Sequence, residues 1–181
     1  MNEQAGIPGA SGSVIGGLFQ RDMEATRRIL RGWFSERMNA RTLEVTTIGP
    51  MREAGLSHEL LSLEIAWDES GTRRSAGFVV RLDPVEYRKR HTSNLRREFE
   101  VQSVLHRRGD VPVPEVCWYE SDAQLLGAEF YAMKRLAGRT LPETPPWQLG
   151  GWFIELDAAG RRALWRNAVS MLARIPVTTT S

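Results

Sequence analysis

Two charged residues, Arg81 and Glu98, stand where their side chains could do chemistry together. Arg81 ends a short apolar run, residues 78–80, whose bulky β-favouring side chains predict a buried strand. Glu98 begins a segment in which apolar residues recur at roughly helical spacing: Phe99, Val101, Val104 and Leu105. This spacing predicts that Glu98 lies on the inward side of a helix, together with Val101 and Leu105. A guanidinium oriented by such a carboxylate can bind phosphate oxygens with its two-pronged fork, although an ordinary, partly buried ion pair is the simpler interpretation of these two residues alone.

Other residues that often carry chemistry do not form a pattern. The three histidines, at positions 58, 91 and 106, have no metal-ligand spacing with one another or with Cys117, so no metal site is expected. Glu98 and Glu100 are two residues apart and face different sides of a helix, so they cannot form a carboxylate pair. Cys117 lies in an apolar run and is expected to pack in the core. Because it is the single cysteine, it excludes an internal disulfide and fits a reducing compartment.

Composition places the chain among soluble globular proteins. With 181 residues, of which 41% are hydrophobic, it can bury one sizeable core. The formal charge is only +2 and no long cluster of basic residues occurs, so nucleic-acid binding is not expected. No apolar run approaches the length of a membrane span, and the N-terminus lacks a basic-then-apolar signal pattern. We therefore expect a cytoplasmic protein without a membrane partner.

The residues that precede Arg81 predict the helix and strands that position it. Residues 1–17 are rich in Gly, Ser and Ala and are expected to be a disordered tail. A helical stripe predicts a helix over 19–38, and β-branched or alternating apolar residues predict strands over 43–48 and 60–67. With strong turn residues at 68–71, these two strands and the strand ending at Arg81 make three consecutive antiparallel strands.

The second half of the sequence predicts further strands and then, after a boundary, a helix. Prolines within 111–116 predict an extended path, and two further strands follow, over 115–119 and 129–136. Gly138 and the proline-rich residues 141–147 mark a boundary. A second amphipathic helix is predicted over 158–175, with Asp157 as its N-cap and Pro176 ending it.

In order and spacing, several segments resemble the aminoglycoside phosphotransferase-like (APH) kinases, especially the bacterial branch related to the kinase domain of acyl-CoA dehydrogenase family proteins. The segments span about residues 43–175 and read GLSHELLSLEI, FVVRLDP, REFEVQSVL, VPVPEV, GAEFYAMKRLAGRTL and GWFIELDAAGRRALWRNAVSMLARI. The resemblance implies an α+β fold like the N-terminal lobe of a protein kinase: a five-stranded antiparallel sheet with one inserted helix. Residues 18–138 would form this lobe with its leading helix, and residues 139–181 a hinge linker and the start of a C-terminal lobe.

The resemblance also implies a nucleotide site, with ATP or another nucleoside triphosphate as the ligand. Its loop above the triphosphate corresponds to Gly55, Leu56, Ser57 and His58, although Ala54 and His58 depart from the family's usual glycine and asparagine. Arg81 falls on the position that contacts the α- and β-phosphates, and Glu98 on the helix carboxylate that orients it. Adenine would be bound by the main chain of Lys134 and Leu136, with Met133 bordering the pocket.

Two parts of the family's machinery have no counterpart in the sequence. The family takes its catalytic Asp from an H-G-D segment and its Mg²⁺ ligands from a later D-x-D-like segment, both after a helix like that over 158–175. No H-G-D occurs, and the sequence ends five residues after Pro176. We therefore expect the first half of a kinase, one that binds nucleotide but has no catalytic residues and no metal ligands of its own. The complete parent would phosphorylate a small-molecule hydroxyl.

Two other functions are compatible with the sequence. The first is a non-catalytic, kinase-like interaction module, because the apolar side of the helix over 158–175 would normally face more of a C-terminal lobe, and an exposed patch of that kind favours self-association. The second is a basic nucleic-acid binder, which salt-dependent binding to arbitrary DNA would support.

Overall fold

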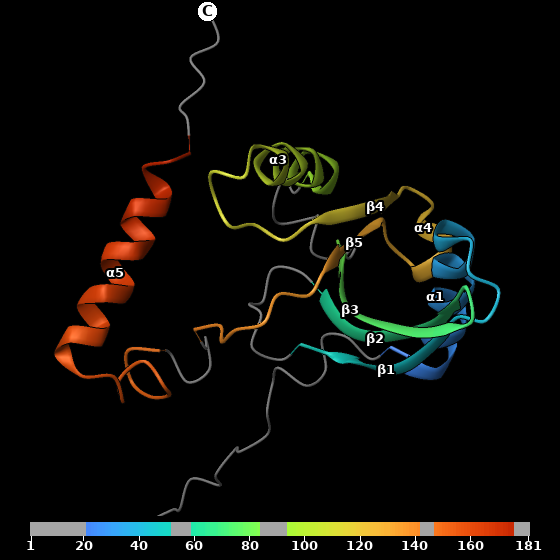
Figure 1. Cartoon of the computed structure of the whole chain (residues 1–181), viewed down its shortest axis with the longest axis horizontal. Coiled ribbons are helices and arrows are strands. Elements are labelled where there is room, and N and C mark those ends of the chain that lie inside the picture. The colour runs from blue at the N-terminus through green and yellow to red at the C-terminus, as the bar shows by residue number, and fades with distance from the viewer. Residues whose placement is uncertain (1–20, 52–58, 84–93, 142–146, 176–181) are drawn as a thin grey trace, which may run out of the picture.

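The computed structural model describes residues 21–51, 59–83, 94–141 and 147–175. Within these ranges, five strands form one antiparallel sheet in the order β1-β2-β3-β5-β4 (Figure 1). The elements are α1 (Met23–Met38), β1 (Glu44–Pro50), β2 (Glu59–Glu69), β3 (Thr72–Leu82), α3 (Leu95–Arg108), β4 (Val116–Glu120), α4 (Ala123–Leu126), β5 (Phe130–Lys134) and α5 (Ala158–Leu172). The expected α+β class is confirmed, with a leading helix, five antiparallel strands and a helix between the third and fourth strands.

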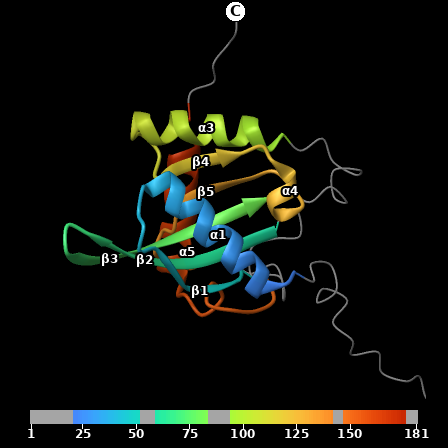
Figure 2. The same ribbon diagram turned by 90° about the vertical axis from the view of Figure 1, so that its right-hand side faces the viewer.

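Helix α1 covers one face of the sheet (Figure 2). It begins at Met23, later than the expected residue 19, because the side chain of Asp22 accepts hydrogen bonds from the main-chain N–H groups of Glu24 and Ala25. Leu30, Trp33 and Phe34 on its inner side are buried against the sheet. Between this helix and the sheet lies the main core, which includes Val45, Leu61, Leu63, Ile65, Phe78, Val80, Leu82, Phe130 and Ala132.

Helix α3 lies along β4, at the edge of the sheet (Figures 1 and 2). Asn94 caps its start, and Gly109 ends it in the left-handed conformation with φ at 71°. Leu95 is buried, whereas Val101 and Val104 are 50% and 46% exposed, so the expected inward position of Val101 is wrong. At about 100° per residue, the face that contains Leu95 and Phe99 turns Val104 almost directly away from the sheet.

The C-terminal part of the described chain packs on itself. Helix α5 begins after Asp157, whose side chain accepts from the Gly160 N–H at 2.6 Å, so the expected N-cap is confirmed. The helix ends at Leu172, three residues earlier than expected, and none of its residues is buried. Its Trp165 packs with a small aromatic cluster that precedes the helix: Trp147, Trp152 and Phe153. α5 lies on the side of the sheet opposite α1 (Figures 1 and 2).

The loop expected before Gly127 contains the short helix α4, whose N-cap is Asp122 and whose left-handed C-cap is Gly127. Among the described residues, no helix is long and apolar enough to cross a membrane. The predicted N-terminal tail falls outside the described residues.

Candidate functional site

Strand alternation gives the sheet a second face, directed away from α1. On β3, Phe78 and Val80 point into the core, so Val79 and Arg81 point the other way. Residues that pair directly across antiparallel strands share a face. The same face therefore carries residues of β5 and of β2. On the β5 side, Met133 pairs with Val79 and Tyr131 with Arg81. On the β2 side, Ser62 pairs with Val79 and Glu64 with Gly77. We call this surface the site face.

At one end of the site face, Arg81 and Glu98 form an ion pair. Arg81 Nη2 lies 2.7 Å from Glu98 Oε2, and the two side chains are 23% and 35% exposed. Glu98 comes from the first turn of α3, where Asn94 fixes the start of the helix. The ion pair expected from the sequence is thus present, and both of its side chains are partly exposed. Its part in binding phosphate remains a prediction.

Aromatic side chains support the inner side of this ion pair. Tyr131, the register partner of Arg81, is fully buried, and its ring lies 5.7 Å from that of Phe99 on α3. Burial raises the pKa of the Tyr131 hydroxyl, and the nearby carboxylate of Glu98 raises it further, against the opposing effect of Arg81. The Tyr131 hydroxyl therefore stays protonated and uncharged, and the buried Tyr131 side chain lies behind the ion pair. Tyr131 was not among the residues predicted from the sequence, because its position opposite Arg81 depends on the pairing of β3 with β5.

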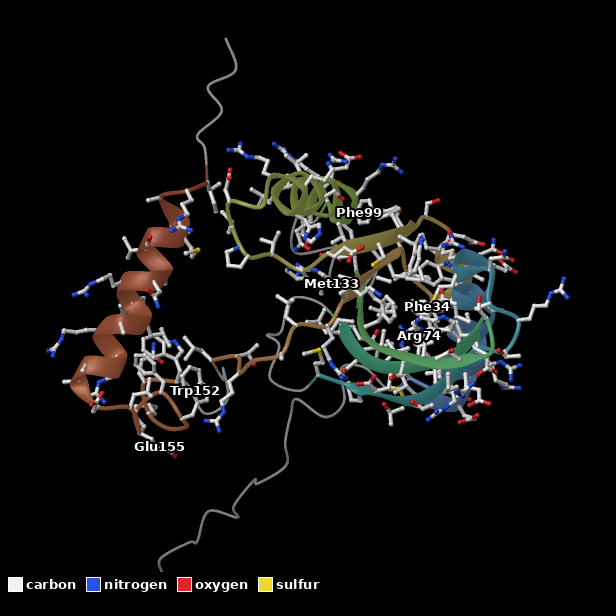
Figure 3. The ribbon with its side chains drawn as sticks, viewed as in Figure 1. Phe34, Arg74, Phe99, Met133, Trp152 and Glu155 are labelled. Atoms are coloured by element: carbon white, nitrogen blue, oxygen red, sulfur yellow. The ribbon has the colours of Figure 1, made fainter. Side chains whose placement is uncertain are left out.

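The middle of the site face is apolar. Val79 is almost fully buried and pairs with Met133, which lies near the end of β5 (Figure 3). Lys134 follows on the opposite face, because its Nζ lies 4.2 Å from the centre of the Phe78 ring in the core. Its side chain therefore points away from the site, and only its main chain could contribute there. Leu136 is exposed just after the strand.

The structure places some of the remaining candidate residues but not others. Gly55, Leu56, Ser57 and His58, the predicted phosphate loop, lie outside the described residues. Cys117 is partly buried against the core, as expected, and burial together with the charge of Glu115 raises the pKa of its thiol to about 11. A thiol with that pKa is almost wholly protonated at neutral pH and is a poor nucleophile. Arg135, which was not among the residues predicted from the sequence, lies at the other end of the site face, against Ser62 and Glu64 of β2.

Comparison with known proteins identifies the class. A family model described as APH, the phosphotransferase enzyme family, matches residues 66–179, a range that includes Arg81, Glu98 and Met133. The match covers more than half of the chain, so the chain belongs to this family, as the sequence resemblance implied.

Two individual proteins are similar to parts of the chain. The chicken acyl-CoA dehydrogenase family member 11 is 32% identical over 85 residues, which make up 44% of this chain and 11% of that protein. A solved structure of a Ralstonia eutropha protein assigned to the aminoglycoside phosphotransferases is 25% identical, with a TM-score of 0.40, over 66% of this chain and 29% of that one. The chain thus spans about a tenth of the length of the first relative and under a third of the second.

Proposed function

We propose that this chain binds ATP, or another nucleoside triphosphate, on the site face and is the nucleotide-binding part of a phosphotransferase that phosphorylates a small-molecule hydroxyl. The observation that carries the proposal is the ion pair between Arg81 and Glu98 at the end of β3. A fixed guanidinium whose orientation is set by a carboxylate suits the α- and β-phosphates. Membership in the phosphotransferase family supports the same reaction class.

The rest of the site face fits the remainder of a nucleotide. Val79 and Met133 supply an apolar floor beside the phosphate end, of the kind that ligand sites use to bury rings. In our proposal, the carbonyl of Lys134 and the N–H of Leu136 bind the edge of the base, and the loop of residues 55–58 lies over the phosphates. Main-chain contacts of this kind agree with the Lys134 side chain pointing toward Phe78 instead.

Magnesium would enter with the nucleotide and neutralise charge on its β- and γ-phosphates. Glu98, the carboxylate paired with Arg81, is already engaged by it and does not suit a metal ligand. Segments that would supply the catalytic Asp and the metal ligands have no counterpart in these 181 residues. We therefore propose that this polypeptide binds the nucleotide but does not by itself transfer the phosphoryl group.

Calorimetry of Mg-ATP binding tests the site. We expect binding to be lost in Arg81→Ala and weakened in Glu98→Ala. Arg73→Ala and Glu100→Ala are matched controls, because Arg73 is an ion-paired arginine on the same strand and Glu100 an ion-paired glutamate on the same helix, both at the surface. These controls should bind ATP as the wild type does. Equal heats in all five proteins would remove the site assignment.

An ATP-turnover assay tests the second half of the proposal. With sugars, amino alcohols and aminoglycosides as acceptors, the purified chain should give the rate of buffer alone. Turnover that disappears in Arg81→Ala would show that the chain completes an active site, and the proposed lack of transfer would be wrong.

A second candidate function is association through α5, with a second copy of the chain as the partner. It is favoured by the exposure of apolar side chains along this helix, notably Trp165, Val169 and Leu172. Light scattering should then show a dimer that Val169→Glu and Leu172→Glu return to a monomer. A wild-type monomer would contradict this candidate and leave the nucleotide proposal untouched.

A further inference from the structure

Arg135 lies flat on the site face, directly above Gly77. Its main-chain N–H continues the sheet by donating to the Gly77 carbonyl at 2.9 Å. A Cβ on Gly77 would lie 2.8 Å from Arg135 Cζ, 2.8 Å from Nη2 and 2.9 Å from Nε. No point within the plane of the guanidinium lies 2.8–2.9 Å from all three of these bonded atoms, so the Cβ position lies above that plane. The guanidinium therefore rests face-down on the sheet, in space that only glycine leaves open.

Neighbouring residues on β2 hold the edges of this guanidinium. Nη1 donates to Ser62 Oγ at 3.2 Å, and Nη2 forms an ion pair with the Glu64 carboxylate. Both partners pair across the sheet with β3, Ser62 opposite Val79 and Glu64 opposite Gly77, so the group is fixed by the sheet itself. The Arg135 side chain is nevertheless 38% exposed. With one face on Gly77 and two N–H edges engaged, the outer face of the plane remains accessible.

The position of this plane relative to Arg81 is set by strand geometry. Gly77, Val79 and Arg81 alternate along β3 and share the site face. At about 3.3 Å per residue, the four steps from Gly77 to Arg81 span about 13 Å. Apolar Val79 and Met133 lie between the two arginines. A base joined through ribose to its first two phosphates has a comparable length.

We propose that the guanidinium of Arg135 is a stacking platform for the base of the bound nucleotide, an inference that rests on the function proposed above. A flat, weakly hydrated guanidinium stacks well on aromatic faces. A guanidinium that stacks in this way contacts the face of the base and not its hydrogen-bonding edge. The platform therefore favours the larger purine rings over pyrimidines without distinguishing adenine from guanine.

Calorimetry with four probes tests this inference: ATP, GTP, CTP and inorganic tripolyphosphate, each with Mg²⁺. The wild type should bind the purine nucleotides ATP and GTP more tightly than CTP. Arg135→Lys keeps the charge but removes the plane, so it should weaken ATP and GTP by about tenfold, CTP by less, and leave tripolyphosphate unchanged. Arg81→Ala, by contrast, should weaken all four probes.

Gly77→Ala provides an independent variant, because its new methyl group would displace the flexible end of Arg135 and leave the Arg135 side chain intact. It should reproduce the selective loss of purine binding. If Arg135→Lys and Gly77→Ala lower the melting temperature but keep the wild-type order of the four probes, Arg135 is a structural tie between β5 and β2, and the inference is wrong. Wild-type protein that binds none of the probes would overturn both the inference and the proposed function. Binding that depends on Arg81 but not on Arg135 would overturn the inference alone.

Discussion

The two faces of the sheet are built from the same strands, yet they hold opposite kinds of side chain. The face toward α1 is filled with buried apolar residues, among them Phe78, Val80 and Phe130. The site face carries two arginine–glutamate ion pairs, Arg81 with Glu98 and Arg135 with Glu64, separated by an apolar strip. Period-two alternation alone accounts for this separation, because a shift of one residue in register would exchange the two faces.

The helices cover the two faces differently. α1 covers its face and turns it into the core, whereas α3 lies at the β4 edge and reaches the site face through Glu98 and Phe99. One face thus supplies the stability of the fold, and the other keeps partly exposed charges in fixed positions. Substitutions on the two faces should separate accordingly, with losses of stability on one and losses of binding on the other.

The largest effect is expected from Phe34→Ala on the α1 face. Phe34 is fully buried, and its ring lies 5.0 Å from those of both Trp33 and Phe78. Removing it leaves a cavity, so the free energy of unfolding should fall by about 3–5 kcal/mol. Chemical denaturation measures this change. Val101→Ala, on the exposed side of α3, is the control and should change the stability by less than about 0.5 kcal/mol. Similar losses in both variants would contradict the assignment of the core to the α1 face.

An intermediate, pH-dependent effect is expected from Glu120→Gln, at the rim of the core. The carboxylate of Glu120 accepts from the Trp33 indole at 2.8 Å and from Arg37 at 2.6 Å. Burial would raise the pKa of Glu120, but the Asp122 N–H, the Trp33 indole and the charge of Arg37 together outweigh burial and hold this pKa below its ordinary value of 4.5. At neutral pH the variant should therefore be less stable by about 1 kcal/mol.

The sign of the pH dependence follows from the lowered pKa. A carboxyl whose pKa is lower in the folded state stabilises the protein above its unfolded-state pKa, and this stabilisation is lost as the pH falls through the folded-state value. The difference between wild type and Glu120→Gln should thus shrink as the pH falls below 4.5. Thermal unfolding across this range measures it. A difference that stays constant or grows with acidity would show that the charge of Glu120 is not what stabilises the rim.

The smallest effect on stability is expected from Glu98→Gln on the site face. The Arg81–Glu98 pair is partly exposed, so solvent and salt screen it, and its loss should cost less than about 1 kcal/mol. The change should become smaller still at high salt. Denaturation at low and high salt measures both quantities. A loss comparable to that of Phe34→Ala would mean that the site face also belongs to the stabilising core, and the contrast between the faces would fail.

Local patterns in the sequence determined the order of the elements and part of the candidate site. β-favouring residues at 78–80 predicted the strand that positions Arg81, and Asp157 predicted the start of α5, because pleating and N-capping act over only a few residues. The Arg81–Glu98 pair followed from these local patterns together with the family resemblance. The extended limits of β3 and the cap at Asp22 differ from the predicted boundaries because pairing and capping, not composition, set where an element ends.

Tertiary structure alone decided which sides of the elements are buried and which distant residues meet. Val101 has the apolar character of a core residue but is exposed, because α3 lies at the sheet edge and packs through Leu95 and Phe99. Gly77 and Arg135 are far apart in the sequence, and their contact exists only because β5 pairs with β3 in one register. Such contacts depend on which strands become neighbours. Strand pairing is selected because it minimises the exposed apolar surface of the whole chain, so the residues near either partner do not indicate it.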